Sequence, residues 1–318
     1  MKCDLCPRKC LVDRKKGEKG ICGQTENLKV ARAALHFWEE PCISGDAGSG
    51  AVFFSGCPLH CVFCQNENIA NGMVGKEISL ERLVDIFLEL QKKRANNINL
   101  VTPGHFVPQI VKALDQARKE GLTLPVVYNT SSYETVDTIK MLEGYVDIYL
   151  PDFKYMSPGL SKKYSHAPDY AEVAKAAIAE MVRQTGKAVF VNGDEDNLIL
   201  RGTIVRHLTL PGCMADSMQI LKYLHETYGD MIYISIMNQF TPLSNLEKYP
   251  ELNRRITDEA EFDMGKTMKR HGSVVVITDE EYETLVDYAI EIGIENGFIQ
   301  EGDTAEESFI PAFDCEGV

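Results

Sequence analysis

The sequence predicts an α/β protein built on a parallel β-sheet, because short apolar runs alternate with helical patterns beyond residue 50. A strand that is followed by a helix and then by another strand forms a crossover unit, and such units build parallel sheets. Gly121, Gly144 and Gly186 stand where three of the helical patterns end, as expected for helix C-caps. A chain of 318 residues with 44% hydrophobic content can bury the large core that this fold needs.

The expected elements follow one another in regular order. Apolar runs predict strands at 51–55, 98–102, 125–129, 146–150, 204–210 and 231–237. Amphipathic spacing predicts helices at 79–95, 107–120, 134–143, 169–185 and 215–228. The insert 187–201 predicts a β-hairpin, because two apolar triplets flank a polar turn. Further on, we expect a charged helix near 257–269 and a last helix over 278–295 that opens with a capping box.

Charge and hydropathy disfavour two classes of partner. Lys+Arg 33 against Asp+Glu 47 gives a formal net charge of −14, which repels nucleic acid at long range. No apolar run approaches the ~20 residues of a membrane span, and the first residues lack the apolar segment of a signal peptide. We therefore expect a cytoplasmic protein.

The ten cysteines are better explained as metal ligands than as disulfides in a reducing compartment, because seven of them form two tight groups. The first group is Cys3, Cys6, Cys10 and Cys22, in a segment too short and polar to form a core. Four thiolates on a metal would fold such a segment. Zinc and a second [4Fe–4S] cluster both suit this spacing, and the alternative is free thiols on a mobile tail. The scattered cysteines are expected to be small buried or incidental residues: Cys42, Cys213 and Cys315.

A domain boundary is predicted at the glycines between Gly45 and Gly50, which form a flexible joint. It separates a cysteine-rich N-terminal segment, 1–46, from a larger unit, 47–318. The stretch 28–40 before the joint is expected to be extended. Glu39 and Glu40 precede a proline, so we expect a solvated turn there, or alternatively the mouth of a site.

The second cysteine group is the most informative motif of the chain. Cys57, Cys61 and Cys64 are spaced C-x3-C-x2-C directly after an apolar run. Three thiolates in one turn can hold three corners of an iron–sulfur cube and leave the fourth iron without a protein ligand. An iron of that kind can bind a small molecule, as an open zinc site does.

This motif, with Phe63 before its last cysteine and Gln65-Asn66 after it, resembles the radical S-adenosylmethionine (SAM) superfamily. The resemblance is greatest to the pyruvate formate-lyase activating enzymes and their uncharacterised relatives, and it runs from Cys3 to about Gln239. It implies a partial (β/α)6 TIM-like barrel with its chemistry at the C-terminal ends of the strands. It also implies that the open iron binds SAM, and that one electron splits SAM into methionine and a 5′-deoxyadenosyl radical that abstracts a hydrogen atom.

The same resemblance suggests roles for residues at the strand ends. Phe63 would pack on the adenine of SAM, while Lys154, beside Asp152, and Arg206 would hold its carboxylate. Thr102-Pro103-Gly104-His105 stands where relatives have Gly-Gly-Glu, so Thr102, His105 or backbone carbonyls would hold the SAM amine. His105 is also a candidate acid/base or substrate contact, the alternative being a satisfied loop histidine.

The remaining strand ends carry amides and two further histidines. Asn129 replaces an aspartate of relatives, which keeps a hydrogen bond to SAM and argues against a monovalent cation there. Asn238 and Gln239 are candidate contacts to ribose or substrate. His60 lies inside the cysteine motif but is expected to be a variable loop residue, and His207 should face away from Arg206 in a packing role.

The leading hypothesis is a radical SAM oxidoreductase of the activating-enzyme type. Its substrate would be a glycine of a partner glycyl radical enzyme, with a peptide or a small molecule as the alternative. By resemblance, a flavodoxin or ferredoxin would donate electrons. Two hypotheses of other classes are a non-catalytic iron–sulfur electron carrier or redox sensor, and a scaffold with zinc at both cysteine groups.

Overall fold

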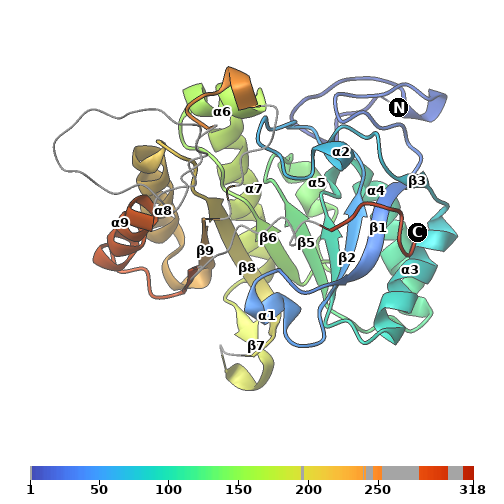
Figure 1. Ribbon diagram of the computed structural model, residues 1–318. Coiled ribbons are helices and arrows are strands. Elements are labelled where there is room, and N and C mark those ends of the chain that lie inside the picture. Colours follow the sequence, from blue (N-terminus) through green and yellow to red (C-terminus); the bar gives the residue numbers. More distant parts are fainter. Residues whose placement is uncertain (1, 195–196, 239, 241–245, 253–278, 300–310) are drawn as a thin grey trace.

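The computed structural model (Figure 1) describes residues 2–194, 197–238, 240, 246–252, 279–299 and 311–318. Its centre is one sheet in which neighbouring strands from β2 to β10 run parallel, with β1 antiparallel to β2 and β3 antiparallel to β1. In order across the sheet, the strands are β10 (Gly297–Ile299), β9 (Tyr233–Met237), β8 (Ile199–Leu208), β6 (Ile148–Pro151), β5 (Val126–Thr130), β4 (Ile98–Val101), β2 (Ser49–Phe54), β1 (Lys29–His36) and β3 (Lys76–Glu77).

Helices connect the parallel strands, as crossover units require. They are α2 (Glu67–Ala70), α3 (Leu80–Lys92), α4 (Val107–Lys119), α5 (Val136–Lys140), α6 (Pro158–Ser165), α7 (Tyr170–Thr185), α8 (Met214–Tyr228) and α9 (Asp279–Glu291). One further helix, α1 (Pro41–Ser44), lies between the antiparallel strands β1 and β2. Short 3-10 turns are η1 (Arg14–Lys16), η2 (Gly104–Phe106), η3 (Val191–Gly193), η4 (Gly229–Met231) and η5 (Leu246–Lys248).

The two faces of the sheet have different environments, because successive strand residues point in opposite directions. Val52 and Phe54 of β2 belong to a core that also contains Leu83 and Phe87 of α3. The intervening Phe53 faces the other way and contacts Phe313, with ring centroids 5.4 Å apart. One face of β2 is therefore covered by helices, and the other faces the interior of the partial barrel.

The predicted α/β fold is confirmed, including all six parallel strands and the five helices between residues 79 and 228. The hairpin is confirmed by β7 (Val189–Phe190), which pairs antiparallel with β8. The sequence predicted two separate segments where β8 runs without interruption, and it did not predict β10. The last helix is present as α9. The charged helix expected near 257–269 lies outside the described residues.

The N-terminal part of the chain enters the sheet through β1, as expected for an extended stretch. β1 pairs with β2 from Val30 opposite Phe54 to His36 opposite Ser49, across the glycine joint. The division of the chain at residue 46 stays a prediction.

The C-terminal residues 311–318 lie along β1 (Figure 1). The Ala33 amide donates to the Glu316 carbonyl at 2.8 Å, and the Cys315 amide donates to the Ala31 carbonyl at 3.1 Å. Arg32 pairs with Asp314 at 3.2 Å. These contacts cover part of the outer edge of β1, which β3 pairs only at its first two residues. Within the described ranges, no helix is long and apolar enough to cross a membrane.

Candidate functional site

The C-x3-C-x2-C motif forms a loop directly after β2, at the C-terminal end of the parallel strands. Backbone amides point at its sulfurs: those of Leu59 and His60 donate to Cys57, and that of Asn66 donates to Cys64. Burial raises the pKa of Cys57 to about 11 and that of Cys64 to about 12. Donors aimed at sulfur favour the thiolate, which is the form that binds metal, against the cost of burial.

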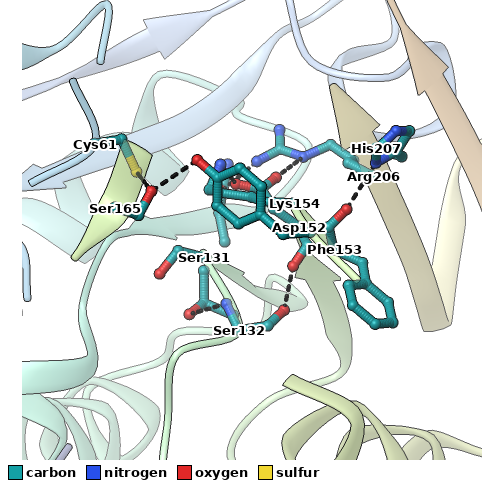
Figure 2. A network of polar contacts seen from close by, with 12 residues as sticks. Cys61, Ser131, Ser132, Asp152, Phe153, Lys154, Ser165, Arg206 and His207 are labelled. Atoms are coloured by element: carbon teal, nitrogen blue, oxygen red, sulfur yellow. Dashed lines mark hydrogen bonds and ion pairs between the residues drawn. The ribbon is translucent and has the colours of Figure 1, made fainter. Parts of the chain in front are cut away.

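The third sulfur of the loop accepts a hydrogen bond from a side chain. Ser165 Oγ donates to Cys61 Sγ at 2.9 Å, and the Tyr155 hydroxyl lies 2.8 Å from Ser165 Oγ. Figure 2 shows Ser165, at the end of α6, beside Cys61. This contact joins α6 to the cysteine loop.

A buried ion-pair network faces the cysteine loop (Figure 2). Asp152, at the end of β6, accepts from Lys154 Nζ at 2.7 Å and from Arg206 Nε at 3.0 Å. Burial acts to raise the pKa of Asp152, but the two cations hold it below its usual value. Burial acts to lower the pKa of Lys154, but Asp152 and the Cys61 thiol raise it above its usual value. Lys154 therefore lies as a cation between Asp152 and the cysteines.

Arg206 also binds two residues deeper in the partial barrel. Its guanidinium donates to Glu39 Oε2 at 3.0 Å and to Asn129 Oδ1 at 2.7 Å. Glu39 Oε1 in turn accepts from Asn129 Nδ2 and from Asn99 Nδ2, both at 3.1 Å. These contacts fix the plane of the guanidinium, because its donors form a rigid fork.

The expectation of a solvated turn at Glu39 and Glu40 is wrong. The Glu39 side chain is 8% exposed, and Glu40 is equally buried. Burial raises the pKa of Glu40 despite the nearby Arg206. The reason is tertiary: the polypeptide between β1 and α1 places these carboxylates against the cation of β8, which no local pattern predicts.

Two strand ends carry strained backbone. Thr102 after β4 has φ +54°, and Ser132 after β5 has φ +63°, both in the left-handed region that non-glycine residues rarely adopt. The Thr102 amide donates to the Asn129 carbonyl at 2.9 Å, and Ser132 Oγ donates to the Asp152 carbonyl at 2.6 Å. Such residues cluster at functional sites, where the surrounding structure holds them.

His105 is packed inside the protein, which is the alternative that the sequence left open. Its Nε2 lies 2.7 Å from the Ser55 carbonyl, and its ring lies 4.4 Å from that of Phe106. Burial lowers the pKa of His105 to about 3, so the imidazole is neutral near pH 7. These contacts do not bring His105 to the ion-pair network.

Glu134 is a buried carboxylate beside the strand ends that the sequence analysis did not single out. Its carboxylate accepts from Thr130 Oγ1 at 2.8 Å and from the Tyr128 hydroxyl at 3.2 Å. It also lies against Gly104, where an added Cβ would come within 2.3 Å of Oε1. The second strand end lacks a glutamate in sequence, but the loop after β5 supplies one in space. The signal in the sequence that could have found Glu134 is its position four residues after Thr130, the last residue of β5. Burial raises the pKa of Glu134 to about 7.

The other residues that the sequence analysis singled out differ in burial and in distance from the cysteine loop. Phe63 is buried, with its ring 6.1 Å from that of Phe240. His207 faces away from Arg206 as expected: it is buried, and it contacts the Phe153 carbonyl at 2.8 Å and Ser217 Oγ at 2.9 Å. Asn238 lies just after β9, and Gln239 lies outside the described residues.

The N-terminal cysteine segment is docked on the cysteine loop. Arg8 donates to the carbonyls of Pro58 at 2.9 Å, Ser165 at 3.0 Å and His166 at 2.6 Å. The His60 ring lies 2.8 Å from the Ile21 carbonyl, so His60 has a docking contact rather than a ligand role. The two cysteine groups are therefore neighbours in space.

Donors also point at three of the N-terminal sulfurs. The Ile21 amide donates to Cys10 at 3.2 Å, and the amides of Arg8 and Gln24 donate to Cys6 and Cys22. In the part of the chain that the structure describes, no three His, Cys, Asp or Glu side chains are grouped to hold a single metal ion. An iron–sulfur cube binds each thiolate through a different iron, so its ligands need not converge on one point. The N-terminal metal site stays a prediction.

The chain is similar to several known proteins. The chain is 28% identical over 266 residues to an uncharacterized protein of Methanocaldococcus jannaschii, MJ0674, covering 81% of this chain and 71% of that protein. Among solved structures, Streptococcus suis SuiB bound to the precursor peptide SuiA matches with a TM-score of 0.48 and 11% identity over 78% of this chain. That match covers 47% of SuiB, so the chain spans about half the length of that protein.

A spore photoproduct lyase variant with bound SAM matches with a TM-score of 0.47 and 16% identity, covering 78% of this chain and 75% of that one. The model of the Radical SAM superfamily matches residues 51–197, which include the cysteine loop, Asp152 and Lys154. Residues 51–197 are therefore similar to the Radical SAM superfamily, a resemblance that implies a [4Fe–4S] cluster and SAM as cofactors.

Proposed function

We propose that this protein is an enzyme that cleaves SAM reductively and uses the 5′-deoxyadenosyl radical to abstract a hydrogen atom from a substrate held over the cluster. The observation that carries the proposal is the position of Lys154. This cation binds Asp152 at 2.7 Å and acts electrostatically on all three thiols of the cysteine loop.

The donor set of the loop fits the cluster. Three thiols in one turn, each with a hydrogen-bond donor aimed at its sulfur, suit three irons of a cube and leave one iron open. When bound, the cluster supplies one electron to the sulfonium of SAM, which separates into methionine and the 5′-deoxyadenosyl radical. Cys57, Cys61 and Cys64 would hold it.

The cations beside the loop suit the carboxylate of SAM. Lys154 Nζ carries three N–H bonds, and its contact with Asp152 uses one of them. Arg206 offers a planar fork, although Glu39, Asp152 and Asn129 already engage it from three sides. We therefore assign Lys154 as the direct contact, with Arg206 beside it.

The other SAM contacts follow from position. Asn129 uses both ends of its amide on Arg206 and Glu39, which favours a supporting role. Thr102, strained at the end of β4, is the candidate for the amine, and Phe63 is the candidate for adenine. Asn238 stays a candidate for substrate.

For the substrate, we propose a glycine in the loop of a partner glycyl radical enzyme, on the activating-enzyme resemblance of the cysteine motif. A flavodoxin or ferredoxin would supply the electron. The N-terminal cysteines would hold zinc or a second iron–sulfur cluster next to the first, because Arg8 and Ile21 dock their segment on the cysteine loop.

The test is anaerobic SAM cleavage. Protein reconstituted with iron and sulfide, reduced with dithionite and mixed with SAM should yield 5′-deoxyadenosine and methionine in equal amounts. Cys57→Ala, Cys61→Ala and Cys64→Ala should each abolish the yield, whereas Cys213→Ala, which removes a buried cysteine outside both groups, should retain it. A protein that binds the cluster but never cleaves SAM would be an electron carrier or sensor. Zinc at both cysteine groups would indicate a scaffold.

A further inference from the structure

A short chain of hydroxyl groups leads to one sulfur of the cysteine loop. Ser165 Oγ lies 2.9 Å from Cys61 Sγ, and the Tyr155 hydroxyl lies 2.8 Å from Ser165 Oγ. Ser165 is fully buried, and Tyr155 is 1% exposed. Water therefore does not compete for these bonds, and each is stronger than it would be on the surface.

The direction of the two bonds follows from what each group can donate. A sulfur bound to iron is only an acceptor, so the single proton of Ser165 must point to Cys61. Ser165 then accepts the proton of Tyr155. Hydrogen bonds arranged in series polarise one another, so the tyrosine strengthens the bond from serine to sulfur.

The backbone on both sides holds the serine in place. Arg8 donates to the Ser165 carbonyl at 3.0 Å and to the His166 carbonyl at 2.6 Å. One residue earlier, the Tyr164 carbonyl accepts from the Val62 amide of the cysteine loop at 2.9 Å. The distance from hydroxyl to sulfur is thus set by several contacts between α6, the loop and the N-terminal segment.

We propose that Ser165, supported by Tyr155, is a positioning residue that raises the reduction potential of the cluster bound by Cys61. Reduction adds one electron, part of whose charge is carried by the sulfurs, so a donor to sulfur stabilises the reduced form more than the oxidised form. The electron comes from an external reductant, and the serine keeps its proton throughout. The inference needs the cluster but no particular substrate.

The experiment is a redox titration of the reconstituted protein without SAM, followed by electron paramagnetic resonance of the reduced cluster. Ser165→Ala should titrate at a more negative potential. We expect the ratio of reduced to oxidised cluster at a fixed potential to fall by about tenfold. For a one-electron couple this fall corresponds to a shift of the reduction potential by about 59 mV. Tyr155→Phe should shift the potential in the same direction by less. Ser165→Thr, which keeps a hydroxyl, should restore it.

The matched control is Ser161→Ala. Ser161 is also buried on α6, but its hydroxyl donates to the Pro158 carbonyl at 3.2 Å, so this variant should titrate as the unchanged protein does. A Ser165→Ala protein with full iron content and an unchanged potential overturns the proposal. If that variant does not hold the cluster, Tyr155→Phe decides, and an unchanged potential there overturns it equally. A protein that binds the cluster but never cleaves SAM can still show these shifts in potential. Failure of the proposed function is therefore distinguishable from failure of the proposal on Ser165.

Discussion

Arg206 of β8 and Glu39, 167 residues earlier in the chain, form an ion pair with a nitrogen–oxygen distance of 3.0 Å. Their side chains are 14% and 8% exposed, so the pair is largely removed from water. Charges in such an environment must be paired, because their desolvation costs several kcal/mol. The segment between β1 and α1 therefore carries the carboxylate that lets Arg206 stay buried as a cation.

The first prediction concerns this pair. Glu39→Ala leaves Arg206 with fewer partners in a buried position, so the free energy of unfolding should fall by about 3 kcal/mol. Urea unfolding measures it. Glu89→Ala is the control, because Glu89 pairs with Arg82 at 2.6 Å but is 45% exposed, and its loss should cost less than about 1 kcal/mol. Equal losses for the two variants would contradict the buried-pair interpretation.

The second prediction concerns SAM affinity. Lys154→Met replaces a charged donor by an uncharged side chain of nearly the same length. This change should weaken SAM binding by about tenfold to a hundredfold while iron content stays the same. Isothermal titration of the loaded, oxidised protein measures the affinity. Lys163→Met is the control, since Lys163 is 49% exposed and pairs with Glu251. Unchanged affinity in Lys154→Met would remove Lys154 from the proposed SAM site.

The third prediction concerns the docking of the N-terminal segment. Arg8→Ala removes donors to three carbonyls, one in the cysteine loop and two at the end of α6. We expect several-fold faster loss of iron from the cluster when a chelator is added, because the loop is held less firmly. The rate is read from the fall in absorbance near 400 nm. Lys9→Ala, an adjacent exposed residue, should lose iron at the unchanged rate. If Arg8→Ala does so too, the docking does not protect the cluster.

The fourth prediction concerns pH. Burial raises the pKa of Glu134 from 4.5 to about 7, so the folded protein holds this proton where the unfolded chain releases it. The contribution of Glu134 to stability is therefore fully present below about pH 4.5 and is lost as pH rises through about 7, by about 3 kcal/mol in total.

Glu134→Gln should lose this decline, because glutamine does not titrate. The readout is urea unfolding of cluster-free protein at pH 5 and pH 7.5, with the difference between the two pH values compared in both proteins. The groups that face Glu134 are Tyr128, Thr130 and Cys6. Tyr128 and Cys6 have raised pKa values, so neither titrates in this window. Identical pH dependence in the two proteins would contradict the buried carboxyl.

The sequence was sufficient for the features that depend on local patterns. Alternating apolar runs and helical spacing predicted the six parallel strands, and the cysteine spacing predicted the similarity to the Radical SAM superfamily that the family model finds over residues 51–197. Strand alternation also placed Arg206 inward and His207 outward, as observed. Each of these confirmed predictions depends on a local pattern, in which the residues lie within about ten positions of one another in the sequence.

The features that the sequence could not predict depend on distant contacts. Glu39 reaches Arg206 only because β1 pairs with β2 and directs the chain toward the interior of the partial barrel. Glu134 meets Gly104 because two strand-end loops are neighbours, and β10 is a three-residue strand without a pattern of its own. Polar residues of this kind look like ordinary loop residues until their partners are known.

The contact of residues 311–318 with β1 has a practical consequence for producing the protein. Removing these residues would leave the Ala31 carbonyl and the Ala33 amide on an open strand edge beside Phe53, which is a template for pairing with a second molecule. Shortened chains should therefore self-associate, and a purification tag fused after Val318 would lengthen a segment already bonded to Lys76 and Arg82.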